Sequence, residues 1–309
     1  MALRSGPPLA PRIGRGLLLA LFSALFVLYV AGPVGWLVSS SLQTEAQITA
    51  VPPNWLPPDP TFANFEAIFT AADREVTYET RRQGDPATGG FLPSGAANLL
   101  PSLWNSLTVG LWVAVLNLLL SLTAAYAIAV IDFRGRRSVL YTVLATRVIP
   151  DIALVVPLFL VVRNLGLINS LGALVVTYLA VTVPFTIFIL ISYFEGIPRD
   201  LYRAARIDGC GHWGALRHVY LPLSLPALVA SLTFAFLTSW NEFVFALVLT
   251  QNVAAQTLPI VISGFIMDFT TSFSFVNAAG VIAIVPPVLM AIVFQRYIVS
   301  GLTAGAVKG

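Results

Sequence analysis

A few polar residues inside long apolar stretches are the sequence's main candidates for chemistry. Arg147 and Asp151 lie four residues apart, and Glu242 follows Asn241. An ionisable side chain costs at least about 2.5 kcal/mol at the centre of a membrane helix, so such residues normally face a protein interior or water. Arg147 and Asp151 would share a face of one helix and could pair there. We expect these four residues to line or gate a polar pathway; the structural alternative is an ion pair or hydrogen bond that locks helices together.

Residue counts exclude several other kinds of site. The single cysteine, Cys210, leaves no disulfide framework and no thiolate metal cluster, and two histidines, His212 and His218, are too few for a multi-histidine metal centre. The sequence contains no G-x-x-x-x-G-K-[S/T] loop with which to bind and split a nucleotide. A net charge of +3 is too small for a nucleic-acid-binding surface. We therefore expect no catalytic residue, metal, bound cofactor or nucleic-acid partner.

Composition indicates the environment that must position these residues. Of 309 residues, 57% are hydrophobic and 10% charged, whereas an ordinary soluble domain has roughly 25% charged residues. Four runs contain no Asp, Glu, Lys or Arg, and each exceeds the roughly 20 residues that span a bilayer core. They are residues 17–38, 101–131, 164–194 and 269–295. The sequence thus predicts an all-α membrane protein.

Six membrane spans are expected. They cover residues 17–38, about 101–131, a kinked 138–163, 171–194, 223–249, and a last span that ends near residue 297. The first could be a signal peptide, but its 22 residues exceed the usual 7–15 of a signal core, which favours a retained helix. The remaining segments are a tail (1–16), a long acidic loop (39–100), a core (101–299) that contains a polar loop at 195–222, and a tail (300–309).

The distribution of basic residues predicts the orientation. Twelve of the 17 Lys and Arg residues fall in the two tails and in the loops at 132–137 and 195–220, against four on the opposite side. By the positive-inside rule both termini are cytoplasmic and the loop at 39–100 is external. In that loop, Phe62, Phe65 and Phe69 have helical spacing, which favours an amphipathic helix over 61–69. Residues 73–95 are expected to be a tethered, poorly ordered loop.

The polar loop at 195–222 is too long for a bare connection and has the signals of a helix. Pro198 suits a helix start, and Asp200 in the first turn complements the helix dipole. Gly209 is placed to end the helix in a left-handed cap. The pattern predicts a short helix over 199–208, followed by a second short turn before Pro222.

This loop resembles the EAA loop of the membrane subunits of ABC importers, whose pattern E-A-A-x-x-x-G is followed about ten residues later by L-P. The matching residues are Ala204, Ala205, Asp208, Gly209, Leu221 and Pro222. The usual glutamate is replaced by Arg203, and Asp200 one turn earlier could take its place in an ion pair. The resemblance implies that this helix docks into a cleft on an ATPase subunit.

Further segments resemble carbohydrate-uptake permeases of the MalG type, over most of the chain from about residue 98 onward. They are Arg147–Pro150, Val156–Leu158, Gly166–Asn169, Ser239–Phe243, Gln295–Ile298 and Gly301–Gly309. The resemblance implies the fold of a type I ABC importer permease in the bacterial inner membrane. It also implies three kinds of partner besides membrane lipid: a second related permease, two ATP-binding subunits that use ATP, and an extracytoplasmic solute-binding protein, which the external loop at 39–100 would receive.

The predicted function is therefore that of a permease subunit, not an enzyme, in an ATP-driven importer for a carbohydrate such as an oligosaccharide or glycoside. A phosphorylated polyol or another non-sugar solute is the alternative within this class. Two other classes remain open. One is an ion-coupled carrier that uses Arg147, Asp151 and Glu242 directly, and the other is a membrane scaffold without a transport role.

Overall fold

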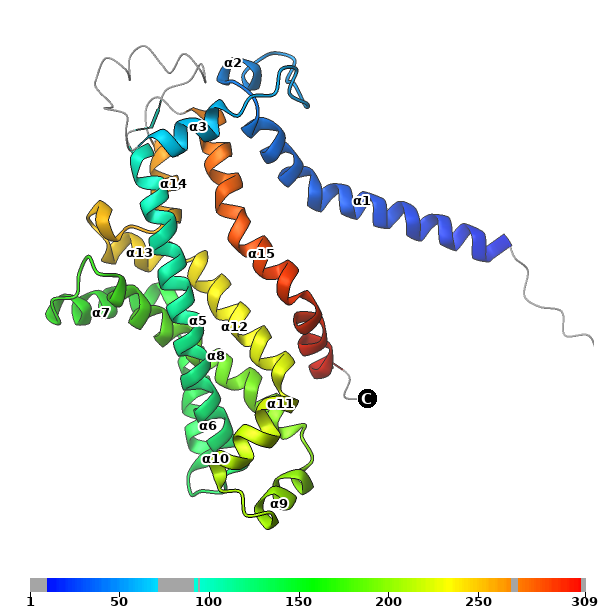
Figure 1. Cartoon of the computed structure of the whole chain (residues 1–309), viewed down its shortest axis with the longest axis vertical. Helices are drawn as coiled ribbons and strands as arrows, with labels where there is room; N and C mark the ends of the chain where they lie inside the picture. The colour runs from blue at the N-terminus through cyan, green and yellow to red at the C-terminus, as the bar shows by residue number, and fades with distance from the viewer. Residues whose placement is uncertain (1–9, 72–91, 94, 268–271, 307–309) are drawn as a thin grey trace, which may run out of the picture. The chain divides into compact units, whose positions relative to one another are not determined.

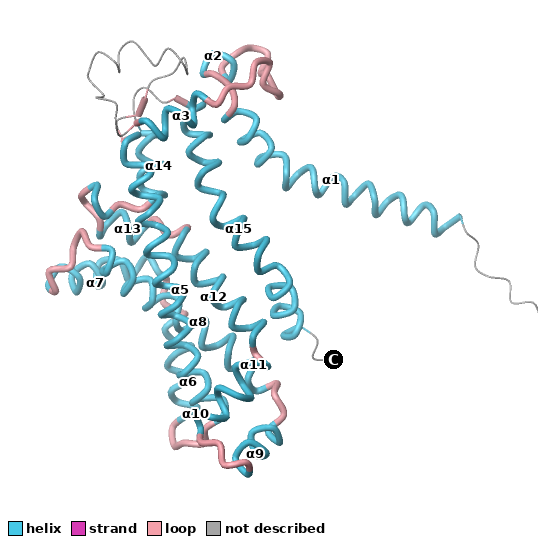
Figure 2. The backbone as a smooth tube through the Cα atoms, in the orientation of Figure 1, coloured by secondary structure: helices cyan, strands magenta, loops and turns pink. Residues whose placement is uncertain are grey.

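The structure is a computed structural model that describes residues 10–71, 92–93, 95–267 and 272–306. Helices make up the described part, which contains no strand, so the predicted all-α fold is confirmed (Figures 1 and 2). The helices are α1 (Ala10–Ser41), α2 (Glu45–Ile48), α3 (Ala63–Thr70), α5 (Leu99–Val130), α6 (Arg136–Thr146), α7 (Asp151–Asn164), α8 (Leu171–Glu195), α9 (Arg199–Ile207), α10 (His212–Ala215), α11 (Leu221–Leu223), α12 (Leu225–Trp240), α13 (Val244–Leu249), α14 (Leu258–Met267) and α15 (Phe273–Ala306).

Four of these helices are long and apolar enough to cross a membrane: residues 16–41 of α1, α5 with the turn before it, α8, and residues 273–297 of α15. Two bent pairs bring the number to six if each pair is one span. One pair is α6 with α7, and the other is the 212–223 segment with α12. The count of six crossings and the cytoplasmic termini stay predictions.

Two compact units make up the chain. The first contains residues 1–94 and 269–282, and the second contains residues 95–268 and 283–309. Within the first unit, the Glu45 carboxylate accepts hydrogen bonds from the Ser272 hydroxyl (3.1 Å) and the Ser274 backbone N–H (3.0 Å) at the start of α15. These bonds explain why residues 269–282 join the first unit, although the sequence placed them in the core at 101–299. In the expected amphipathic segment, α3 begins at Ala63; the segment at 73–95 lies largely outside the described residues.

The second unit is organised around α5, α8 and α12, which pack along one another. Two buried polar contacts join α5 to α8: Asn117 donates to the Thr186 hydroxyl (2.8 Å), and Ser121 donates to the Val183 carbonyl (3.3 Å). Their partners lie on the facing helix, so neither donor is left unpaired in an apolar interior, where an unpaired donor would cost about 1–3 kcal/mol. These contacts fix the register of the two long helices that carry the sites described below.

The third and fifth predicted spans are each divided into two helices. The third is broken between Thr146 and Asp151, and α6 and α7 meet at 98°. Pro150 explains the break, because proline disfavours helical backbone in the residue before it and cannot donate to the preceding turn. The fifth divides at residues 241–243 into α12 and α13, and α14 follows at residues 258–267.

Close helix packing makes Gly110 sensitive to substitution. A Cβ at this position of α5 would lie 2.9 Å from a ring carbon of Phe236, whose ring is buried and stacked on Trp240 at 5.6 Å. Gly110→Val is therefore expected to destabilise the protein by about 1–3 kcal/mol through overpacking. The thermal midpoint of the purified protein in detergent measures this loss. Gly264→Val in α14, where nothing lies within 4 Å of the added Cβ, is the control, and equal shifts in both variants would contradict the packing argument.

Candidate functional site

Residues 196–224, between α8 and α12, are here named the linker segment. This segment contains the predicted helix. Helix α9 begins at Arg199, directly after Pro198, and ends at Ile207, one residue earlier than expected. Gly209 has φ +84°. Its N–H donates to the Arg206 carbonyl (3.2 Å), and the Cys210 N–H donates to the Ala205 carbonyl (2.9 Å). This is the Schellman pattern of hydrogen bonds, so the predicted left-handed cap is confirmed.

Helix α9 presents an apolar surface to the outside of the chain. Ala205 is buried against the rest of the protein, whereas Ala204 and Asp208 are exposed. Ile207 is 86% exposed and Leu201 is 43% exposed. These two large apolar side chains of α9 are therefore available for contacts outside the chain.

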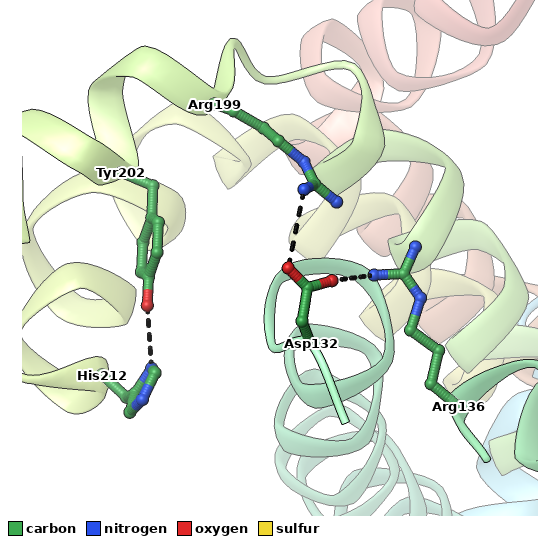
Figure 3. Close-up of polar contacts among 5 residues, drawn as sticks. All are labelled: Asp132, Arg136, Arg199, Tyr202 and His212. Atoms are coloured by element: carbon green, nitrogen blue, oxygen red, sulfur yellow. Dashed lines mark hydrogen bonds and ion pairs between the residues drawn. The ribbon is translucent and has the colours of Figure 1, made fainter. Parts of the chain in front are cut away.

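A hydrogen-bonded and stacked pair attaches α9 to the start of α10. The Tyr202 hydroxyl meets His212 Nδ1 at 3.1 Å, and the two rings stack with centroids 6.2 Å apart (Figure 3). The Tyr126 hydroxyl on α5 donates to the His212 backbone carbonyl at 3.0 Å. The start of α10 is thus tied both to α9 and to the long helix α5.

Residues after α9 form more than the short turn expected. Helix α10 continues through one π-helical turn, Leu216–Tyr220, into α11, and this piece meets α12 at 82°. Leu221 is half-buried and Pro222 is exposed in α11, so the two residues that match the L-P of the family pattern lie just before the bend. A movement of α9 would therefore reach α12 through a continuous helical piece.

Asp132, directly after α5, lies between two arginines from different elements. Its carboxylate is 2.9 Å from Arg136 at the start of α6 and 3.8 Å from Arg199 at the start of α9 (Figure 3). Sequence reasoning missed this residue, because its partner Arg199 is 67 positions away. Arg203 pairs with Asp200 of its own helix at 3.1 Å. The Asp132 pairs join three elements at the same end of the second unit.

One pocket contains two of the four predicted pathway residues. Asp151 and Glu242, 91 residues apart in sequence, both line a cavity of about 190 Å³. The other lining residues are Ile152, Tyr178, Val181, Thr182, Thr238, Ser239, Val244 and Phe245. Glu242 accepts hydrogen bonds from the backbone N–H groups of Phe245 (2.8 Å) and Ala246 (3.1 Å). A carboxylate at the start of α13 is favoured by the helix dipole.

Arg147 and Asn241 do not line this pocket. Arg147 follows the end of α6, so it shares no helical face with Asp151, and the expectation that they do is wrong. Its guanidinium donates to the Val181 carbonyl (3.0 Å) and lies over the Phe185 ring, 5.8 Å from the centroid. Asn241 donates to the Leu237 carbonyl of its own helix (2.8 Å) and lines a second cavity, of about 310 Å³, between α12, α14 and α15.

The pocket's hydroxyl residues were missed by sequence reasoning. Tyr178 and Thr182 lie four residues apart on α8, and Thr238 and Ser239 end α12. The available signal was the i, i+4 spacing of two hydroxyls in an otherwise apolar span, which places them on one face.

Comparison with known proteins matches residues 117–304 to the family model described as the binding-protein-dependent transport system inner membrane component. The sulfoquinovosyl glycerol transport system permease protein SmoH of Agrobacterium fabrum is 36% identical over 290 residues, which are 93% of each chain. The trehalose/maltose transport system permease protein MalG of Thermococcus litoralis is 42% identical over 208 residues, 67% of this chain and 75% of that protein.

A solved structure of a transporter chain has the same fold. A chain of a bacterial ABC transporter involved in the import of the acidic polysaccharide alginate is 24% identical and superposes with a TM-score of 0.76, covering 95% of this chain and 99% of that one. At this level of identity the likeness extends to the fold.

Proposed function

Because the chain belongs to the family of binding-protein-dependent transport system inner membrane components, we propose that it forms half of the translocation pathway of an ATP-driven importer for a carbohydrate. As a multi-pass inner-membrane permease subunit it is not an enzyme. Its relatives named above include permeases for a sulfoquinovosyl glycerol and for trehalose and maltose, which supports a sugar or glycoside as the solute. Both termini lie in the cytoplasm in this proposal.

The observation that carries the proposal is α9 with its exposed apolar residues. We assign it to the docking of an ATP-binding subunit, whose cleft would cover Leu201 and Ile207. The match at Ala204, Ala205 and Gly209 and the tethers to α5 support this role. The transporter would contain two such subunits, a second related permease and an extracytoplasmic solute-binding protein. ATP would bind to the partner subunits, and this chain would bind no cofactor.

Coupling in this proposal runs from α9 to the membrane helices. Closure of the ATP-binding subunits moves α9. This helix has few ways to move alone, because Tyr202 attaches it to His212 and Tyr126 of α5 holds the His212 backbone carbonyl. The movement passes through α10, the π-helical turn and α11 to α12. Helix α12 ends at the pocket that Asp151 and Glu242 line. The linker segment is thus a lever between the site of ATP hydrolysis and the solute pathway.

Purification of the transporter from its host tests the proposal. Co-purifying proteins identified by mass spectrometry should include an ATP-binding subunit, a second permease and a solute-binding protein that carries a sugar. Proteoliposomes that contain the whole complex should transport that sugar only when ATP is present on the side of the membrane where the ATP-binding subunits lie. Absence of an ATP-binding subunit from an otherwise active complex would reject the proposal.

An ion-coupled carrier is the second candidate, since two carboxylates line one pocket. The same proteoliposomes separate the two functions. Uptake that survives inactivation of the ATP-binding subunits but collapses with a protonophore would favour the carrier.

Asp132→Asn is expected to change stability by less than about 1 kcal/mol, because both its ion pairs are exposed to solvent. It should reduce solute-stimulated ATPase activity severalfold at low salt, since it releases the start of α9 from the end of α5. High salt should narrow the difference from the unmodified protein, because salt screens exposed pairs. Asp59→Asn, an exposed acid of the first unit, is the control. Equal effects of the two substitutions would contradict a role for Asp132.

A further inference from the structure

We propose that the pocket lined by Asp151, Tyr178, Ser239 and Glu242, here named the acid–hydroxyl pocket, contacts the transported solute and accepts an uncharged, hydroxyl-rich ring in preference to an anion. This inference rests on the proposed transport function and narrows its substrate class. The pocket lies among α7, α8, α12 and α13, so the proposal assigns one part of the solute pathway to this chain.

Two buried hydroxyls in the pocket lack an adequate partner. Tyr178 is 2% exposed and Ser239 is 6% exposed, and the hydroxyl of each has no partner of good hydrogen-bond geometry among the described residues. The Tyr178 hydroxyl is close enough to the Glu242 carboxylate to interact with it, but not in that geometry. Buried hydroxyls are normally hydrogen-bonded, and each one left unpaired costs about 1–3 kcal/mol. A hydroxylated ligand in the cavity would supply the partners.

The charges that line the pocket are acidic. Asp151 and Glu242 are its two carboxylates, and no Lys or Arg belongs to the lining. Arg147 does not line the pocket, but its guanidinium donates to the carbonyl of the lining residue Val181 and lies over the Phe185 ring, so its charge is already bound by these groups. Carboxylates accept hydrogen bonds from sugar hydroxyls but repel carboxylate and sulfonate groups. The pocket therefore favours a neutral sugar over a uronate or a sulfonated sugar.

The roles of the two acids differ. Both oxygens of Glu242 accept hydrogen bonds from backbone N–H groups of α13, which fixes the position of the carboxylate. Asp151, exposed in the first turn of α7, keeps its oxygens available to a ligand. The cavity of about 190 Å³ is smaller than the roughly 300–1,000 Å³ of pockets that enclose a drug-sized ligand, so it fits one ring of a larger sugar.

Cysteine labelling in the complete complex tests the charge preference. The chain's only cysteine, Cys210, is first replaced by serine, and Ser239→Cys then places a near-isosteric reporter in the pocket. The rates of modification by 2-aminoethyl and 2-sulfonatoethyl methanethiosulfonate are measured by mass spectrometry of this chain. Ser192→Cys, an exposed position of α8 outside the pocket, corrects for the intrinsic reactivities. Thr238→Cys is a second reporter in the lining if Ser239→Cys fails to assemble.

We expect the corrected rate of the cationic reagent to exceed that of the anionic reagent by at least about tenfold, since a charged cleft concentrates counter-ions. Asp151→Asn should reduce this ratio severalfold. Trehalose, a neutral disaccharide, should slow the labelling more than galacturonate does at equal concentration. A corrected ratio near one, or equal protection by both sugars or by neither, overturns the proposal. If ATP-driven sugar uptake persists in the same proteoliposomes, only the pocket assignment fails; loss of ATP dependence rejects the transport function itself.

Discussion

Gly209→Pro is expected to abolish ATP-driven uptake while leaving the protein in the membrane. Gly209 has φ +84°, a left-handed conformation that proline cannot adopt, because its ring holds φ near −65°. Proline also removes the N–H that donates to the Arg206 carbonyl. The Schellman bonds would be lost, and the chain after α9 would leave in another direction. Since the long helices contain none of these groups, insertion should be unaffected.

Two substitutions at the same position separate backbone conformation from bulk. Nothing lies within 4 Å of a Cβ added to Gly209, so side-chain volume alone is tolerated. Gly209→Asn should retain most of the activity, since asparagine adopts left-handed backbone comparatively well. Gly209→Ala should lie between, at a local cost of about 1–2 kcal/mol. The measurement is the solute-stimulated ATPase activity of the reconstituted complex. Normal stimulation of this activity in Gly209→Pro would contradict the assignment of α9 to coupling.

Features set by local sequence were predicted well. Helix α9 and its cap follow from Pro198, Asp200 and Gly209, which act within one or two turns of the residues they affect. The span at 171–194 became α8 because its apolar run has no break and its N-cap, Ser170, accepts a hydrogen bond from the Ala173 N–H.

Features set by distant contacts were not predicted. Pro150 signals an interruption, but the sequence does not tell a kinked helix from two helices at 98°. Because of this break, Arg147 and Asp151 do not share a helix. Asp151 instead lines one pocket with Glu242, which comes from a distant part of the chain, and no spacing rule predicts that they do so. Asn241 and Glu242 are adjacent in sequence yet line different cavities, since the chain turns between α12 and α13.

Phe194→Ala is expected to give the largest loss of stability among these substitutions. Phe194 is the second-last residue of α8 and is buried. Its ring meets those of Tyr126 (6.4 Å) and Tyr220 (5.6 Å) edge to face, and the two tyrosine rings are 5.2 Å apart. Truncation of a buried phenylalanine to alanine costs about 3–5 kcal/mol. The three rings join α5, α8 and the π-helical turn, so the cavity would loosen the attachment of the whole linker segment.

Two measurements distinguish this local loosening from general damage to α8. The thermal midpoint of Phe194→Ala should fall well below that of Phe188→Ala, because Phe188 lies on the same helix but is 45% exposed. The yield of co-purified ATP-binding subunit should fall with it, since Tyr126 would no longer hold the His212 carbonyl firmly and α9 would lose its fixed position. Equal midpoints for the two variants would show that the aromatic cluster does not anchor the segment. A lowered midpoint with full retention of the ATP-binding subunit would instead show that docking needs α9 alone, because the helix would then bind its partner without the rigid support that the three rings provide.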